Sequence, residues 1–182
     1  ISILMWEDDP YLMLLTGDFP SEEIIKIANG MNNYGINTKG KARHFLAQVR
    51  AETANGYGII EGGYKAGDGV YNGSALRSYS PFGGAGFLHL THDYAYEEFG
   101  KLMGDARIYD PPKYAMQHVA IAYPDKSAGW FWKEKKKIDS SVNWNSDSDA
   151  IGKKVTGLVF GDETEWTKSR KAYYETICKV LL

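Results

Sequence analysis

Glu52 is the residue whose type and position most strongly indicate chemistry. It follows Phe45 by seven residues and Val49 by three, so a helix through this segment places its carboxylate on the same stripe as two large apolar side chains. Burial disfavours the charged form of a carboxyl group, which suits a general acid that works near neutral pH. The alternative is that Glu52 ends its helix and turns outward, and the spacing alone favours neither interpretation.

A second carboxylate, Glu61, follows nine residues later in a glycine-rich stretch. Residues 55–86 contain so many glycines that no helical period survives, and we expect a loop or β-hairpin there. A carboxylate in such a loop stays hydrated and ionised. One buried and one exposed carboxylate across a cleft match the acid and base of a glycosidase, although the 23 acidic residues of the chain offer many other pairs.

Residues 82–94 form the third candidate segment. Its three glycines allow another backbone or a ligand to approach closely, and residues 87–90 are typical of a short buried strand. Thr91 then precedes a helix that we expect over residues 93–99. Its hydroxyl fits two roles equally well, a helix cap and a catalytic group.

Three blocks of the sequence resemble the family 19 glycoside hydrolases. Residues 45–53, FLAQVRAET, resemble the family segment F-L-A-Q-x-x-H-E-S/T. Residues 84–94, GAGFLHLTHDY, are similar to the block G-R-G-x-I-Q-L-T/S-x-x-x-Y, and residues 127–132, SAGWFW, to S-A-x-W-F-W. The blocks occur in family order, and three ordered blocks are far more specific than any one of them.

The resemblance implies a mainly α (α+β), lysozyme-like fold with two lobes around a sugar-binding cleft and a small glycine-rich β-hairpin region beside it. It also implies roles: Glu52 protonates the leaving glycosidic oxygen, Glu61 activates water, and Thr91 positions that water. The short step from Glu52 to Glu61 looks like that of bacterial and phage members rather than plant chitinases. By analogy hydrolysis is inverting, for which the carboxylates lie roughly 6.5 to 9.5 Å apart.

Residues in and near these blocks are the candidates for sugar contacts. Aromatic rings pack well on the faces of sugar rings, although each aromatic residue taken alone is more often part of a core or a hairpin. The residues that we expect to bind substrate are Tyr57, Tyr64, Phe82, His89, Tyr94 and Trp130.

The chain departs from the family pattern at several positions. Ala51 stands where the family has a His before the acid, Ala85 replaces the Arg of G-R-G, and His89 replaces the Gln before Leu-Thr. Ala95 replaces a later Asn, and the C-terminal I-N-G-G motif appears only as VTGL at residues 155–158. These changes affect the expected sugar subsites more than the expected general acid. They are also compatible with a domain that binds glycan but does not cleave it.

The length of 182 residues fits one domain, which the resemblance implies is a glycoside hydrolase catalytic domain over residues 1–182, either complete or cut from a larger protein. The net charge of -2 and the pI near 6.1 lack the basic footprint of a nucleic-acid-binding protein. No apolar run approaches the ~20 residues of a membrane span, so we expect no membrane partner.

Cys178 cannot form an internal disulfide and is interpreted as a small core residue. His89 and His92 lack further zinc ligands, so no metal and no cofactor is expected.

Helical spacing predicts six helices, which lie over residues 21–33, 38–52, 93–99, 114–123, 127–138 and 163–182. The polar stretch 143–149 is predicted to be a loop.

Three functions remain open. The first is an endolysin-like peptidoglycan hydrolase of the muramidase kind that cleaves β-1,4 bonds of the cell-wall glycan. The second is a chitinase, and the third a glycan-binding domain without activity. We expect a monomer that acts on the bacterial cell wall. Because no signal peptide is visible, we expect it in the host cytoplasm before release or within a larger secreted or virion protein.

Overall fold

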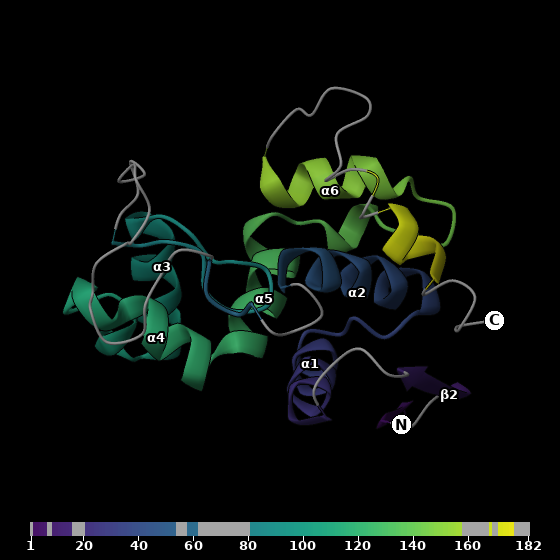
Figure 1. Cartoon of the computed structure of the whole chain (residues 1–182), viewed down its shortest axis with the longest axis horizontal. Coiled ribbons are helices and arrows are strands. Elements are labelled where there is room, and N and C mark those ends of the chain that lie inside the picture. Colours follow the sequence, from purple (N-terminus) through teal and green to yellow (C-terminus); the bar gives the residue numbers. More distant parts are fainter. Residues whose placement is uncertain are drawn as a thin grey trace.

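The computed structural model of the protein describes residues 2–6, 9–15, 21–53, 58–61, 81–157, 168 and 171–176. This part of the chain is mainly helical (Figure 1), which confirms the predicted fold class. The strands and long helices are β1 (Ser2–Trp6), β2 (Asp9–Leu15), α1 (Ser21–Asn33), α2 (Lys39–Thr53), α3 (Asp93–Met103), α4 (Pro112–Ala122), α5 (Pro124–Trp130) and α6 (Ser148–Thr156). The short helical segments are η1 (Ala106–Ile108), η2 (Phe131–Lys135) and η3 (Asp139–Ser141).

Helix α2 is the centre of the larger lobe. Every residue from Ala42 to Val49 is buried, polar ones included, so this helix is enclosed on all sides rather than on one stripe. Its apolar side chains form one core with buried residues of α1, α5, η2 and α6. Within that core the ring of Phe45 meets the ring of Trp132 edge-on at 5.4 Å between centroids. The helix that carries Glu52 is therefore anchored in the core of the larger lobe.

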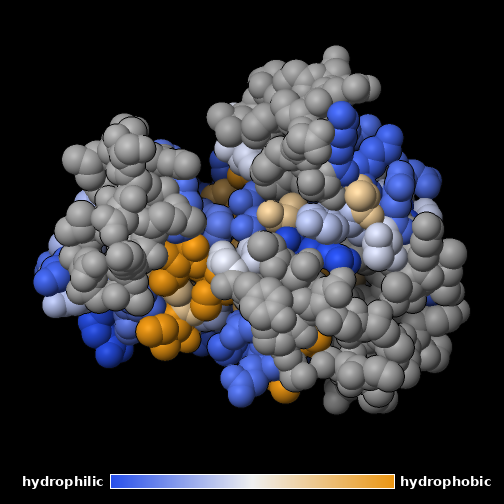
Figure 2. All heavy atoms as spheres, viewed as in Figure 1, coloured by the Kyte–Doolittle hydropathy of each residue, from blue (hydrophilic) through white to orange (hydrophobic). Residues whose placement is uncertain are grey.

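A second core belongs to the smaller lobe, which is built by α3, η1 and α4 (Figure 1). The segment α5–η2 contributes to both cores, since Ala128 and Trp132 belong to the first and Trp130 to the second. This segment therefore joins the two lobes. Figure 2 shows hydrophobic residues gathered on the side of the smaller lobe that faces the larger one, on an otherwise largely hydrophilic described surface.

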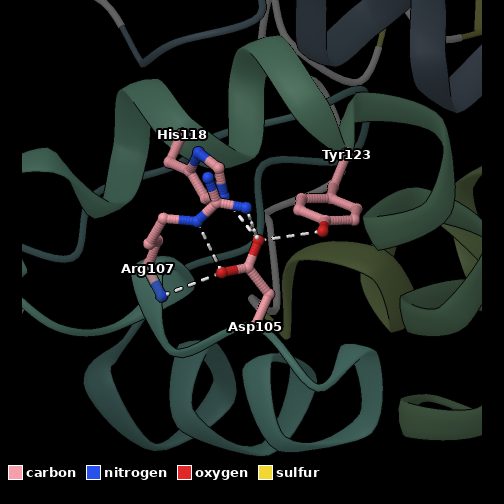
Figure 3. A network of polar contacts seen from close by, with 4 residues as sticks. All are labelled: Asp105, Arg107, His118 and Tyr123. Atoms are coloured by element: carbon pink, nitrogen blue, oxygen red, sulfur yellow. Dashed lines mark hydrogen bonds and ion pairs between the residues drawn. The ribbon is translucent and has the colours of Figure 1, made fainter.

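A polar network around Asp105 ties η1 to α4 in the smaller lobe (Figure 3). The Asp105 carboxylate accepts hydrogen bonds from Arg107 Nε at 2.8 Å and from the Tyr123 hydroxyl at 2.9 Å, and it lies 2.8 Å from His118 Nε2. Hydrogen bonds from Arg107 and His118 hold the pKa of Asp105 well below its usual value. The network thus links the turn between α3 and α4 to helix α4 through one carboxylate whose charged form is favoured.

Several elements differ from the sequence-based expectation. The antiparallel β1–β2 hairpin and helix α6 were not predicted. Phe87, Leu88 and Leu90 are buried as expected, but residues 86–89 form a turn rather than a strand, with single bridges from Ala85 to Ile60 and to Leu90. That prediction was wrong because burial and short length do not distinguish a packed turn from a strand.

Other predictions fall on residues outside the described part. The expected hairpin over residues 55–86 is described only at residues 58–61 and 81–86, and Cys178 lies outside the described residues. Of the expected last helix, residues 168 and 171–176 are described and are helical. None of the described helices is long and apolar enough to cross a membrane.

Candidate active site

Glu52 lies in the last turn of α2, where the chain leaves the core of the larger lobe. Its side chain is only 14% exposed, so it does not turn outward at the end of the helix. The turn is closed by Thr53, whose hydroxyl donates to the Val49 carbonyl at 2.6 Å and whose carbonyl accepts from the Gly58 N–H at 2.7 Å. The interpretation of Glu52 as a half-buried carboxylate is therefore the one that the geometry favours.

The side chain that faces Glu52 is His89. Its Nδ1 atom lies 3.4 Å from Glu52 Oε2, and its Nε2 atom lies 2.8 Å from the carbonyl oxygen of Gly58. Burial lowers the pKa of His89, but the Glu52 carboxylate, the Gly58 carbonyl and the Glu61 carboxylate together raise it above its usual value. His89 thus contacts Glu52 and is mostly enclosed, and its role in binding sugar stays a prediction.

Glu61 is fixed by the backbone of Gly84. The N–H of Glu61 donates to the Gly84 carbonyl at 2.8 Å, and the N–H of Gly84 donates to Glu61 Oε2 at 3.0 Å. A Cβ atom on Gly84 would lie 2.8 Å from His89 Cβ and 3.3 Å from Glu61 Cβ. Only glycine fits there, because Gly84 lies between these two side chains. Glu52 and Glu61 both lie beside His89, Glu52 through the contact to Nδ1 and Glu61 across Gly84.

Thr91 lies beside this group and is not the cap of α3. The N-cap position belongs to His92, which makes no side-chain cap hydrogen bond. The Thr91 hydroxyl instead donates to the carbonyl of His89 at 2.6 Å. A hydroxyl has a single hydrogen, so toward any further partner the Thr91 oxygen acts as an acceptor.

The remaining residues predicted to bind sugar have different surroundings. Tyr94 is 58% exposed, and its ring stacks on that of His92 at 5.4 Å between centroids. Phe82 is half-buried and packs against Tyr96 at 5.2 Å. Trp130 is 3% exposed and belongs to the second core, so its ring offers no face to a sugar and we no longer assign it to substrate binding. Tyr57 and Tyr64 lie outside the described residues.

Two backbone groups of the site were missed by sequence reasoning. The Gly58 carbonyl holds His89, and the Gly84 peptide holds Glu61. A carbonyl carries no side-chain signature, and the glycines were interpreted only as sites of close approach. Among the described residues, no group of three or more His, Cys, Asp or Glu side chains is placed to hold a metal ion.

Comparison with known proteins supports the fold. No protein-family profile and no curated protein sequence matches the chain. Its structure is similar to the crystal structure of chitinase C from Streptomyces griseus HUT6037, with a TM-score of 0.63 and 18% sequence identity. The match covers 86% of this chain and 83% of the chitinase chain. The chain therefore has a chitinase-like, lysozyme-like fold.

Proposed function

We propose that the protein is a glycoside hydrolase in which Glu52 is the general acid and Glu61 the general base. The observation that carries the proposal is that both carboxylates lie beside His89, Glu52 at 3.4 Å from Nδ1 and Glu61 across Gly84. Glu52 is mostly enclosed and faces His89, whereas Glu61 accepts a hydrogen bond from a backbone N–H. Contrasting surroundings of this kind are how two carboxyl groups acquire opposite roles. The chitinase-like fold is consistent with this chemistry.

The proposed reaction assigns one step to each carboxyl group. Glu52 donates its proton to the glycosidic oxygen as the bond from that oxygen to the anomeric carbon breaks. Glu61 removes a proton from a water molecule, whose oxygen forms the new bond to the anomeric carbon from the opposite face. The Thr91 oxygen accepts a hydrogen bond from the same water, since its own hydrogen is engaged by the His89 carbonyl. The product has the inverted anomeric configuration.

Peptidoglycan is the substrate that we propose first. The nine-residue step from Glu52 to Glu61 resembles the bacterial and phage members of family 19 rather than plant chitinases. Chitin is the second candidate, because the similar solved structure is that of a chitinase. The two substrates share β-1,4 bonds, and product analysis distinguishes them.

A glycan-binding domain without activity is less well supported. Two of the departures that suggested it, Ala85 and Ala95, are 0% and 2% exposed and pack in the second core. Substitutions at these positions alter core packing more directly than the surface that meets a glycan.

The test is release of reducing ends and product masses from purified peptidoglycan and from chitin oligosaccharides. We expect soluble fragments from the unmodified chain, and none above background from Glu52→Gln or Glu61→Gln. Removal of a general acid or base costs typically 10²- to 10⁴-fold in rate. Glu97→Gln is the matched control, because Glu97 is an exposed carboxylate of α3 that pairs with Lys101 on the same helix. Full activity in Glu52→Gln would refute the assignment of the acid, and glycan binding without any product would support the binding domain instead.

A further inference from the structure

The two ring nitrogens of His89 have different partners, and only one of these nitrogens can gain or lose a proton. Nε2 lies 2.8 Å from the Gly58 carbonyl oxygen, and a carbonyl oxygen can only accept. Nε2 therefore carries a hydrogen whether the ring is neutral or charged. Nδ1 is the nitrogen that gains or loses a proton, and it faces Glu52 Oε2 at 3.4 Å.

We propose that Glu52 and His89 hold one proton between Oε2 and Nδ1, and that His89 is a positioning residue that keeps this proton available to the general acid. The proposal rests on the proposed function of Glu52. With the proton present, either the carboxylic acid donates to a neutral ring or a charged ring donates to the carboxylate. Without it, a carboxylate oxygen and a ring lone pair face each other, which is repulsive. The pair therefore releases its last proton less readily than an isolated carboxyl group does.

The carboxylates around the His89 ring also favour retention of its proton. The carboxylates that face His89 are Glu52 from the end of α2 and Glu61 from the segment paired with Gly84, and both favour the charged ring. Burial opposes them, but the pKa of His89 is still raised. Two groups this close titrate as a pair, so the loss of the last proton belongs to both residues together.

The proton balance of the reaction is simple. Glu52 gives the shared proton to the leaving glycosidic oxygen, and the pair is left as a carboxylate with a neutral ring. Glu61 gains one proton from water in the same turnover and releases it to solvent. The Glu52–His89 pair then takes up one proton from solvent, which restores the acid for the next turnover.

The first test is the pH profile of kcat for His89→Gln. Glutamine can still donate a hydrogen bond to the carboxylate, but it does not titrate. An opposite charge within ~4 to 6 Å shifts such a titration by roughly one to three pH units. We therefore expect the alkaline limb to move to lower pH, with about tenfold or greater loss of kcat at pH 7 relative to the variant's own optimum and little change in KM. His118→Gln, which removes a histidine of the smaller lobe, is expected to keep the wild-type limb. An unchanged limb in His89→Gln would overturn the proposal.

The second test does not depend on activity. In ¹⁵N NMR spectra of the imidazole nitrogens we expect His89 to keep its Nε2 hydrogen throughout and to titrate at Nδ1. In Glu52→Gln the midpoint of that titration is expected to fall. If the unmodified chain cleaves no glycan but these spectra are obtained, the proposed function fails and the shared proton stands. A hydrogen on Nδ1 of the neutral ring, or a midpoint that ignores Glu52→Gln, refutes the shared proton even in an active enzyme.

Discussion

His44 provides a measurable link between burial in α2 and stability. It lies in the middle of the helix, is 0% exposed, and its ring is 4.6 Å from the ring of Tyr174. Burial, with a smaller effect from the neighbouring charge of Arg43, lowers the pKa of His44 from 6.5 to about 4. In the unfolded chain the same residue takes up a proton near its ordinary value. Between these two pH values the unfolded state binds more protons than the folded state, so acid favours unfolding.

The size of the effect follows from the shift. Each pH unit between the folded and unfolded values corresponds to ~1.4 kcal/mol, so the shift of His44 corresponds to about 3 kcal/mol. This contribution is complete above pH 6.5 and is lost progressively as the pH falls to about 4. The perturbation that isolates it is His44→Phe, which keeps a buried ring of similar shape but cannot be protonated.

The assay is urea unfolding of the wild type and His44→Phe at several pH values from 7.5 to 4. We expect the free energy of unfolding of the wild type to fall by about 3 kcal/mol relative to the variant across this range. His118→Gln is the control, since it removes a histidine from the other lobe and is expected to keep the acid-dependent slope due to His44. Parallel curves for the wild type and His44→Phe would refute the reasoning, because they would show that His44 is protonated equally in both states.

Three further comparisons test the fold and the site. Gly86→Ala places a Cβ against the Ser127 hydroxyl at φ +80°, whereas Gly104→Ala at φ +66° meets nothing within 4 Å. We expect urea unfolding to show a loss of about 1 kcal/mol for Gly104→Ala and several times that for Gly86→Ala. Asp105→Asn removes the charge that Arg107 binds, so thermal unfolding is expected at a lower temperature than in the wild type. Trp130→Ala is expected to cost about 3 to 5 kcal/mol of stability, while Tyr94→Ala raises KM for glycan and leaves the unfolding temperature unchanged.

The parts of the fold that the sequence predicted are those with strong helical spacing. Helix α2 was predicted to within one or two residues, whereas its spacing left open whether Glu52 turns outward, and the structure shows the side chain mostly enclosed. Helices α1, α3 and α4 were predicted for the same reason. The mainly helical, lysozyme-like fold was predicted from the three ordered sequence blocks between residues 45 and 132. The spacing of apolar residues within any one segment could not have predicted it.

Elements whose apolar residues lack a strong helical period in the sequence were not predicted. Helix α6 has a readable signal that went unused: Asp147 caps its first turn by accepting from the N–H groups of Asp149 and Ala150, and Ile151 and Val155 follow at helical spacing. The polar residues 143–149 obscured it. The contact of His89 with the Gly58 carbonyl could not be predicted, because a backbone carbonyl carries no side-chain signature in the sequence.

His44 and His89 affect the pH dependence of stability in opposite directions. The pKa of His44 is lowered, so its contribution is lost as the pH falls from 6.5 to about 4. The pKa of His89 is raised, so its contribution is complete below the ordinary value of 6.5 and is lost as the pH rises through the folded value. The same proton of His89 serves the general acid in our proposal. Stability and activity are therefore expected to decline over the same alkaline range, and a stability profile without this decline would show that Glu52 does not hold His89 in its charged form.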